Sequence, residues 1–327
     1  MQGEHNRPFF TVHTPSYKRV SYLERVWEAL CNQTYKDFEW IVADDGSDDG
    51  TLELLKKLKK QSSFPVTIIA ASQRVGKTVL DNHAVKLAKG YMFIYQDSDD
   101  ALKPDALELI YNEWNTIPEI ERDSYCGVTA FCEENGRVIS SQLPLPAPFD
   151  TTWVDLKYKY NVTGDMYYFC RTDILRSCLL PEVDFYMAES AYRIPIGTAY
   201  KARVIDKVVA IKEYNSPNCI SFSGKMKYCL GYLYAMAICW NVLSEKRPEF
   251  SVRPLKELIT YFRYAVHGDV GISKACAMLK RNPSILASML VLPISMTLAL
   301  KDKLQGKVCK THLEFNDSVK SSKISYI

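Results

Sequence analysis

An alternation of short apolar runs and helical patterns over residues 9–114 constrains the fold of this chain most. Four runs rich in β-branched and aromatic residues each precede a stretch that has apolar residues at helical spacing. The runs are residues 9–13, 38–43, 66–70 and 91–94. Strands that alternate with helices through short connections are typical of a parallel, doubly wound sheet. We therefore predict an α/β protein with a Rossmann-like, mostly parallel sheet.

Polar residues follow three of these four strands. Residues 14–19 (TPSYKR) follow the first strand, which should end at Pro15 because a proline cannot donate to a sheet ladder. Residues 44–47 (DDGS) follow the second, and residues 97–100 (DSDD) follow the fourth. The carboxyl ends of parallel strands lie along one edge, where open α/β sheets bind ligands. We expect these three segments to converge on one site.

The acidic turn after the fourth strand is a candidate metal site. Asp97, Asp99 and Asp100 place three carboxylates within four residues, directly after an apolar run. Carboxylate oxygens suit Mg²⁺ or Mn²⁺, whose other positions water and phosphate oxygens can fill. The alternative is a solvated turn that caps the next helix. The expected convergence with the two other strand ends favours the metal.

Composition narrows the class of protein. The chain is 47% hydrophobic and 24% charged, as expected of a globular protein with a buried core. Its formal net charge of +3 is too small to argue for a nucleic-acid partner. The ten cysteines are scattered without a C-x-x-C pair, which argues against zinc or a disulfide framework and for a reducing cytosol. The polar start, MQGEHNRP, predicts no signal peptide.

The second half of the chain has weaker patterns. Residues 126–132 and 137–140 are predicted to form two strands joined by an Asn135-Gly136 hairpin turn. Residues 204–214 alternate as a final strand, and helical, aromatic segments follow. We expect the polar tail from Cys309 onward to be loosely ordered.

Residues 285–300 contain no charge and are flanked by basic residues on both sides. They are shorter than the roughly 20 residues of a spanning helix, and Pro293 would kink them. Three interpretations stay open: a buried core helix, an interfacial or re-entrant membrane segment, and a true span. The basic flanks favour contact with an anionic bilayer surface.

Four motifs in order resemble one known family. TPSYKR, ADDGSDDGT, the R-x-G-K loop at residues 74–77 and QDSDD together resemble the nucleotide-sugar domain of family 2 glycosyltransferases of the GT-A fold. The match covers residues 8 to about 105 and continues more faintly to about residue 215. It implies a nucleotide-sugar half at 1–105, an acceptor half at 106–225 and a helical C-terminal extension at 226–327.

The resemblance also implies a reaction and its partners. The enzyme would be a metal-dependent, inverting glycosyltransferase with Mn²⁺ or Mg²⁺ as cofactor. It would move a hexose from a nucleotide-diphosphate sugar, a UDP-sugar first of all, to a glycan or lipid-linked glycan acceptor in polysaccharide biosynthesis. The expected location is cytoplasmic, peripheral at the cytoplasmic face of the inner membrane, and a homo-oligomer stays open.

Residue roles carry over by position. Asp45 matches the aspartate that accepts a hydrogen bond from uracil, and Tyr17 matches the aromatic residue that stacks on the base. Arg74 and Lys77 would neutralise the diphosphate. The alternatives are an Asx turn, plain packing and solvated loop charges, respectively. Two carboxylates of the acidic turn would hold the metal, and which two is left open. The remaining residues expected to line the donor pocket are Thr14, Pro15, Arg19, Asp97 and Ser98.

Glu189 is the candidate catalytic base. An inverting transfer needs a carboxylate that takes the proton of the acceptor hydroxyl. Relatives have Glu-Asp at this place, whereas this chain has Glu189-Ser190. The alternative is a helix residue paired with Arg193 at i+4. Asp165 and Asp184 are the other candidates.

Two further hypotheses compete with the transferase. A sugar-phosphate nucleotidyltransferase would need a glycine-rich phosphate loop after the first strand, and TPSYKR has no glycine. A non-catalytic, membrane-associated binding protein on a degenerate transferase scaffold is supported only by the missing carboxylate after Glu189.

Overall fold

The computed structural model describes residues 7–183, 186–213, 225–248, 255–280, 285–307, 309 and 324–327. The chain divides into two compact units. The first comprises Met1–Pro181, Ala199–Ser216 and Phe315–Ile327, and the second comprises Glu182–Thr198 and Pro217–Glu314. The sheet belongs to the first unit, and most of the C-terminal helices belong to the second.

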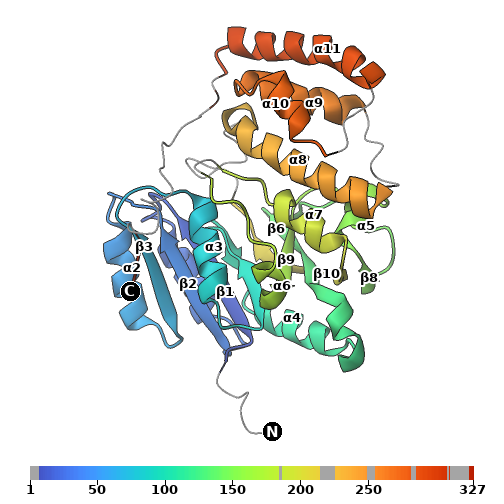
Figure 1. Cartoon of the computed structure of the whole chain (residues 1–327). Coiled ribbons are helices and arrows are strands. Elements are labelled where there is room, and N and C mark those ends of the chain that lie inside the picture. Colours follow the sequence, from blue (N-terminus) through green and yellow to red (C-terminus); the bar gives the residue numbers. More distant parts are fainter. Residues whose placement is uncertain are drawn as a thin grey trace. The chain divides into compact units, whose positions relative to one another are not determined.

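One mixed sheet forms the first unit, and its parallel part is the predicted one (Figure 1). Four neighbouring parallel strands lie in the order β3 (Val66–Ala71), β2 (Phe38–Asp44), β1 (Phe10–Ser16) and β4 (Met92–Tyr95). The sheet continues through β9 (Met166–Arg171), β6 (Tyr125–Glu134), β10 (Lys201–Ile211) and β5 (Ala101–Leu102). β9 is antiparallel to β4 and β6, so β6 and β10 again run parallel to β4.

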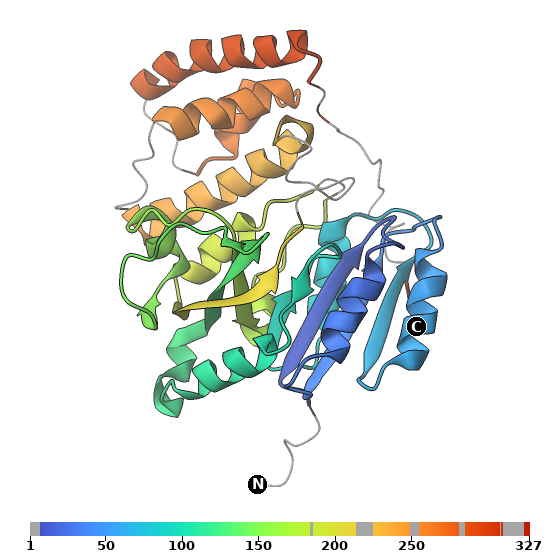
Figure 2. The ribbon, with the colours of Figure 1, turned by 180° about the vertical axis from the view of Figure 1, so that it is seen from behind.

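Helices cover both faces of the parallel strands, as a doubly wound sheet requires (Figures 1 and 2). α1 (Leu23–Cys31), α2 (Thr51–Gln61) and α4 (Ala106–Asn115) share one apolar core with β1 and β2. α3 (Lys77–Leu87) contacts β1, β2 and β3 and packs with α6 (Thr172–Arg176) on the other face. The predicted α/β fold with a mostly parallel sheet is therefore confirmed.

The first strand does not end where the sequence predicts. β1 continues through Pro15 to Ser16, with Pro15 opposite Ala43 of β2. The carbonyl of His13 accepts a hydrogen bond from the N–H of Gln96 beyond β4, so alternate residues of β1 direct their peptide groups towards β4. β4 has ended at Tyr95 by the level of Pro15. The missing N–H therefore costs no ladder hydrogen bond.

The second half of the sheet carries short additions. β7 (Arg137–Val138) forms the predicted hairpin with β6, and Asn135 and Gly136 have φ of 50° and 76°, as a tight turn of this kind needs. β8 (Phe149–Thr151) pairs with β10, and the 3₁₀ helix η1 (Glu119–Ser124) and helix α5 (Trp153–Tyr158) fill the connections. The predicted final strand ends at Ile211, and Tyr214 lies outside the described residues.

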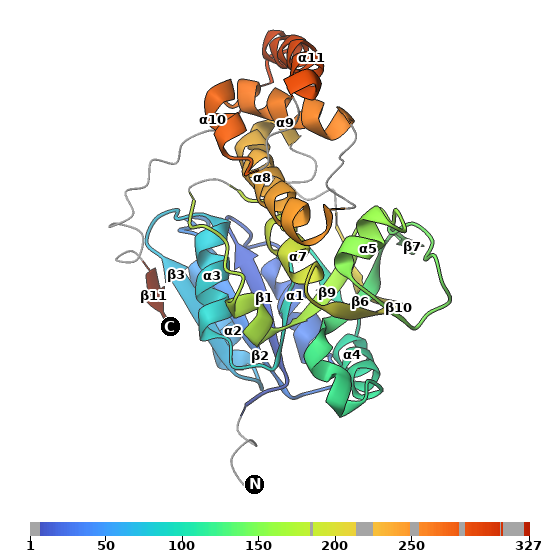
Figure 3. The ribbon, with the colours of Figure 1, turned by 45° about the vertical axis from the view of Figure 1, so that its right-hand side comes forward.

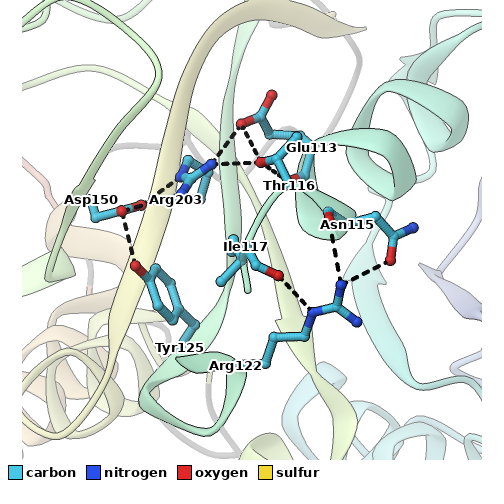
Figure 4. A network of polar contacts seen from close by, with 8 residues as sticks. All are labelled: Glu113, Asn115, Thr116, Ile117, Arg122, Tyr125, Asp150 and Arg203. Atoms are coloured by element: carbon cyan, nitrogen blue, oxygen red, sulfur yellow. Dashed lines mark hydrogen bonds and ion pairs between the residues drawn. The ribbon is translucent and has the colours of Figure 1, made fainter. Parts of the chain in front are cut away.

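A polar network ties these additions together at the amino ends of β6 and β10 (Figure 4). Arg203 of β10 binds Asp150 of β8 through Nε and Glu113 of α4 through Nη1, at 2.5 and 3.0 Å. Tyr125 donates to the same Asp150 at 2.9 Å. One guanidinium thus joins the neighbouring strands β8 and β10 to helix α4.

The end of the chain is more ordered than the sequence predicts. β11 (Ile324–Tyr326) pairs antiparallel with β3 (Figure 3). Pairing satisfies the edge of β3, which would otherwise expose a row of backbone donors and acceptors. The tail residues between Cys309 and β11 lie outside the described part of the chain.

The second unit is helical. It contains α7 (Ser190–Gly197), the 3₁₀ helix η2 (Lys225–Tyr228), α8 (Cys229–Lys246), α9 (Leu255–His267), α10 (Ile272–Ala277) and α11 (Ile285–Leu304). α9 packs between α8 and α11 (Figure 1). Within the described residues, no helix is both long enough and apolar enough to cross a membrane.

Candidate active site

The three predicted strand ends meet at one edge of the sheet. The N–H of Asp45, after β2, donates to the carbonyl of Ser16 at the end of β1, at 2.9 Å. The N–H of Lys18 donates to Ser47 Oγ at 2.8 Å. Arg19 reaches the acidic turn after β4, with Nη2 3.4 Å from Asp99 Oδ2. Convergence of these segments is therefore a property of the fold.

Asp45 is buried beneath a backbone loop. Its Oδ1 accepts hydrogen bonds from the N–H groups of Val75 and Gly76, at 2.6 and 2.9 Å. The loop passes so close that a Cβ on Gly46 would lie 2.5 Å from the backbone of Gln73. Burial raises the pKa of Asp45 to about 6, although the two N–H donors and the nearby Arg74 oppose that rise.

Tyr17 and Arg74 lie against each other beside Asp45. The guanidinium carbon of Arg74 is 4.4 Å from the centroid of the Tyr17 ring, a cation–π contact. The Nε of Arg74 is 3.4 Å from Asp45 Oδ2. The structure thus brings together the three residues that the sequence assigns to the base and the diphosphate. It also shows that Arg74 covers one face of the Tyr17 ring.

Lys77 is held by partners that the sequence analysis missed. Its Nζ lies 2.7 Å from Asp81 Oδ2, and Asp81 Oδ1 lies 3.0 Å from Nε2 of the buried His13. The other ring nitrogen of His13 faces the carbonyl of Ile41 at 2.9 Å. Burial of Asp81 opposes ionisation, but Lys77 and His13 outweigh it and lower its pKa. The i,i+4 spacing of Lys77 and Asp81 on one helix was the available signal.

Asp100 is saturated by protein groups. Its carboxylate receives the Lys212 ammonium at 3.0 Å, the Tyr167 hydroxyl at 2.9 Å and the N–H of Glu213 at 3.2 Å. Burial raises its pKa to about 6, against the effect of Lys212. Lys212 Nζ is also 3.7 Å from Asp97 and 4.0 Å from Asp165. Burial disfavours the Lys212 charge, yet these carboxylates outweigh it and raise the pKa of Lys212.

Asp97 and Asp99 remain better suited to an external cation. The Asp97 side chain is 42% exposed, and Asp99 Oδ2 lies 3.4 Å from Arg19 Nη2. Across the described residues, no group of three or more His, Cys, Asp or Glu side chains is arranged to hold a metal ion. Two carboxylates with water and phosphate oxygens form an ordinary Mg²⁺ or Mn²⁺ site, so this donor set fits such an ion.

Two buried polar atoms near the turn lack partners. Within the described part of the chain, Arg19 Nη1 and Ser16 Oγ make no hydrogen bond. Buried polar atoms are normally paired, so each orphan requires an explanation. Ser16 is the last residue of β1 and its carbonyl accepts from the N–H of Asp45, and Arg19 follows the strand and lies 3.4 Å from Asp99. A ligand with acceptor oxygens would satisfy the Arg19 nitrogen.

The other predicted residues have different surroundings. Thr14 Oγ1 accepts a hydrogen bond from Trp40 Nε1 at 3.0 Å, Pro15 lies within β1, and Ser98 is buried in the acidic turn. Glu189 belongs to the second unit, at the start of α7, with Oε2 3.4 Å from Arg193 Nη2. Asp184 lies outside the described residues.

Comparison with known proteins agrees with this geometry. Residues 11–173 match the family model of glycosyl transferase family 2. A 110-residue segment is 37% identical to chondroitin synthase of Pasteurella multocida (strain Pm70). The segment covers 34% of this chain and 11% of that protein. The chain therefore spans only about a ninth of the length of this curated relative.

Solved structures show the same fold over nearly the whole chain. Residues 1–349 of S. aureus TarS, in complex with UDP-GlcNAc, superpose with a TM-score of 0.54 at 19% identity, covering 94% of this chain and 93% of that one. The mannosyltransferase PcManGT from Pyrobaculum calidifontis, with GDP-Man and Mn²⁺, gives 0.54 at 17% identity, covering 93% and 89%. At these identities the likeness concerns the fold, which is the GT-A fold.

Proposed function

We propose that this protein, which carries a glycosyl transferase family 2 domain over residues 11–173, transfers a sugar from a UDP-sugar to a polysaccharide acceptor. The family match confirms the resemblance that four motifs indicate. One observation carries the proposal: Tyr17, Asp45 and Arg74 lie at the same sheet edge as Asp97 and Asp99. This arrangement supports a base subsite next to an acidic turn that would hold the diphosphate through a metal ion.

The base subsite suits uracil. The Val75 and Gly76 N–H groups occupy Asp45 Oδ1, and Oδ2, which lies 3.4 Å from Arg74 Nε, has a further lone pair that can accept from the N3–H of uracil. The Tyr17 ring offers a face on which a base can stack. The TarS structure contains a UDP-sugar and the mannosyltransferase structure a GDP-sugar, so the fold serves both. The carboxylate acceptor is our reason for preferring the uridine donor.

The diphosphate would lie between the basic residues and the acidic turn. Arg74 and Arg19 can donate to its oxygens, Arg19 through the nitrogen that lacks a partner among the described residues. Lys77 adds a third positive charge, oriented by Asp81. Asp97 and Asp99 would hold Mn²⁺ or Mg²⁺, which neutralises the charge that develops on the departing diphosphate. Asp100 stays a structural group, fixed by Lys212.

The attack requires a general base, and we propose Glu189. The carboxylate takes the proton from the acceptor hydroxyl while its oxygen forms a bond to the anomeric carbon. The bond from that carbon to the diphosphate oxygen breaks, and its electron pair leaves with the diphosphate. The result is inversion at the anomeric carbon. Asp165, 4.0 Å from Lys212 in the first unit, is the alternative base.

For the acceptor we propose a lipid-linked glycan, handled at the membrane surface by the acceptor half and the C-terminal helices. The similarity to chondroitin synthase, whose name refers to a polysaccharide product, supports a glycan acceptor. The uncharged residues 285–300 between basic flanks support contact with a membrane.

The test is metal-dependent turnover of UDP-sugars. Hydrolysis of UDP-GlcNAc, UDP-glucose and UDP-galactose is measured with Mn²⁺ and with a chelator. We expect turnover with at least one donor that chelation abolishes. Asp99→Asn should remove this activity, while Asp105→Asn, an exposed carboxylate at the start of α4, should retain it. A protein that binds no UDP and turns over no UDP-sugar contradicts the proposal.

A non-catalytic binding protein is the second candidate, and one observation favours it. The Glu189 carboxylate pairs with Arg193, the contact expected of an ordinary helix residue, and no second carboxylate follows it. Glu189→Gln separates the two. If the protein is a transferase, the unmodified chain turns over a UDP-sugar, and Glu189→Gln loses transfer while its UDP affinity is unchanged. If it is a binding protein, the unmodified chain already binds UDP without turnover.

A further inference from the structure

Helix α11 exposes an unusually apolar face. Leu290, Ile294, Met296, Leu300 and Leu304 are between 49% and 81% exposed. Four of them recur at i, i+4, i+10 and i+14, which places them on one side of a helix with 100° per residue. An exposed apolar surface formed by several neighbouring large side chains is typical of a site of contact.

The opposite face of α11 packs against α9. Val291, Ser295 and Ala299 are buried against α9, and Ser295 Oγ donates to the carbonyl of Ile259 at 3.0 Å. Asp302, the single acidic residue of α11, is buried and pairs with Arg263 Nε at 2.6 Å. The exposed apolar side chains are therefore presented outward by a helix whose other side is fixed.

The charges next to this face are mostly positive, and the exposed Asp269, 2.7 Å from Lys303, is an acidic neighbour. Lys301 and Lys303 stand at the exposed end of α11, and Lys307 follows the helix. Residues 255–307 contain eight basic and three acidic residues, a net charge of +5, so the rest of the chain carries −2. Positive charge is thus concentrated in the segment that carries the apolar face. An apolar face with flanking lysines suits an anionic lipid surface.

We propose that the exposed face of α11, formed by Leu290, Ile294, Met296, Leu300 and Leu304, docks on an anionic bilayer. The apolar side chains enter the boundary between headgroups and acyl chains, and Lys301 and Lys303 contact lipid phosphates. The proposal rests on the proposed function, since it supplies the surface by which a transferase reaches a lipid-linked acceptor.

A second copy of the chain is a poorer occupant of this face. A two-fold pairing presents the same surface on both sides, so the lysines of one copy meet the face of the other. The nearby carboxylates are already engaged within one copy, because Asp302 is buried against Arg263 and Lys307 and Asp269 pairs with Lys303 at 2.7 Å. Anionic lipid headgroups supply the missing negative charge.

Vesicle co-sedimentation of the full chain tests the proposal. Vesicles of phosphatidylcholine mixed with phosphatidylglycerol should bind the protein, and phosphatidylcholine alone should bind it much less. Ile294→Glu/Leu300→Glu should weaken binding by about tenfold or more, because apolar insertion is lost and charge is repelled. Lys301→Gln/Lys303→Gln should weaken it by about fivefold for each lysine near the surface. Ile120→Glu, at an apolar side chain in the first unit that is 93% exposed, is the matched control.

The outcomes separate this inference from the proposed function. Equal binding of the Ile294→Glu/Leu300→Glu variant and the unmodified chain overturns the docking face. Equal binding to both kinds of vesicle overturns the role of anionic lipid. If the unmodified chain binds no vesicles and forms a dimer that Ile294→Glu/Leu300→Glu dissociates, the face belongs to a second copy instead. The UDP affinity of Ile294→Glu/Leu300→Glu, measured without vesicles, should equal that of the unmodified chain. An unmodified chain that binds vesicles but no UDP would contradict the proposed transferase and leave the docking face in place.

Discussion

The ammonium of Lys212 lies 3.0 Å from Asp100 and 3.7 Å from Asp97, so the acidic turn is built around an internal cation. The Asp100 carboxylate also accepts hydrogen bonds from the Tyr167 hydroxyl and from the backbone N–H of Glu213. The three aspartates of the turn therefore divide into two kinds. Asp100 anchors the turn to the end of β10, while Asp97 and Asp99 are the two that we propose to hold the metal.

Replacing Lys212 by Met should destabilise the protein. The change leaves the buried Asp100 carboxylate without its cation, and breaking a buried ion pair costs about 3–5 kcal/mol. We expect the free energy of unfolding in urea to fall by about that amount. Lys207→Met, at an exposed position of the same strand, should change it by less than about 0.5 kcal/mol.

A double-variant cycle isolates the pair. Asp100→Asn in the Lys212→Met background should recover part of the lost stability, because the uncompensated charge is gone. Identical losses for Lys212→Met with and without Asp100→Asn would mean that Lys212 acts through other contacts.

Uridine affinity should depend on the ionisation of Asp45. Its carboxylate is proposed to accept the uracil N3–H, and burial raises the Asp45 pKa to about 6. Affinity should therefore be about tenfold weaker at pH 5 than at pH 7. Uridine is the right probe because it has no phosphate that titrates in this range. Asp45→Asn should bind weakly at both pH values, and a pH dependence that survives in this variant would assign it to another group.

The same pKa predicts the sign of a stability effect. Between the ordinary Asp pKa of 3.8 and about 6, folded Asp45 holds a proton that the unfolded chain releases. The free energy of unfolding should thus fall as pH rises through this window, by at most about 3 kcal/mol, and level off above it. Asp100, whose pKa is also raised to about 6, contributes a fall in the same window. Urea unfolding from pH 4 to 7 should therefore show a smaller fall in Asp45→Asn than in the unmodified chain.

Sequence patterns predicted the elements of the site better than its internal contacts. The strand ends and the acidic turn follow from local apolar periodicity and sheet topology, whereas Asp45 and Tyr17 were singled out through the resemblance to family 2 glycosyltransferases. Lys212 could not be found in this way, because it comes more than a hundred residues after Asp100 and joins it only through β10. Pro15 was misread because its effect depends on which neighbouring strand has already ended at its level.

Arg74→Ala should affect uridine and UDP differently. Arg74 covers one face of the Tyr17 ring at 4.4 Å, and it is also proposed to bind the diphosphate. Removing it should weaken UDP binding by about tenfold, the worth of one charge-assisted hydrogen bond. Uridine affinity should stay the same or rise, because the ring becomes accessible for stacking. Calorimetric titration with both ligands checks this, and Lys57→Ala, at an exposed lysine of α2 paired with Glu24, is the control.

An equal loss of uridine and UDP affinity in Arg74→Ala would place Arg74 at the base instead of the diphosphate. An unchanged affinity for both would reduce it to a surface charge of the loop. Tyr17→Ala should weaken both ligands by a similar factor, since it removes the stacking surface that they share.

Arg203→Lys should reduce stability without affecting nucleotide binding. Arg203 joins Asp150, Glu113 and Thr116 at the amino ends of β6 and β10, the edge opposite the candidate site (Figure 4). A lysine keeps the charge but cannot make these directional contacts at once, because it lacks the planar fork. We expect the free energy of unfolding to fall by about 2 kcal/mol, with UDP affinity unchanged. Arg137→Lys, at an exposed position of β7, should leave both quantities as they are, and a loss of UDP affinity in Arg203→Lys would mean that the two edges of the sheet are coupled.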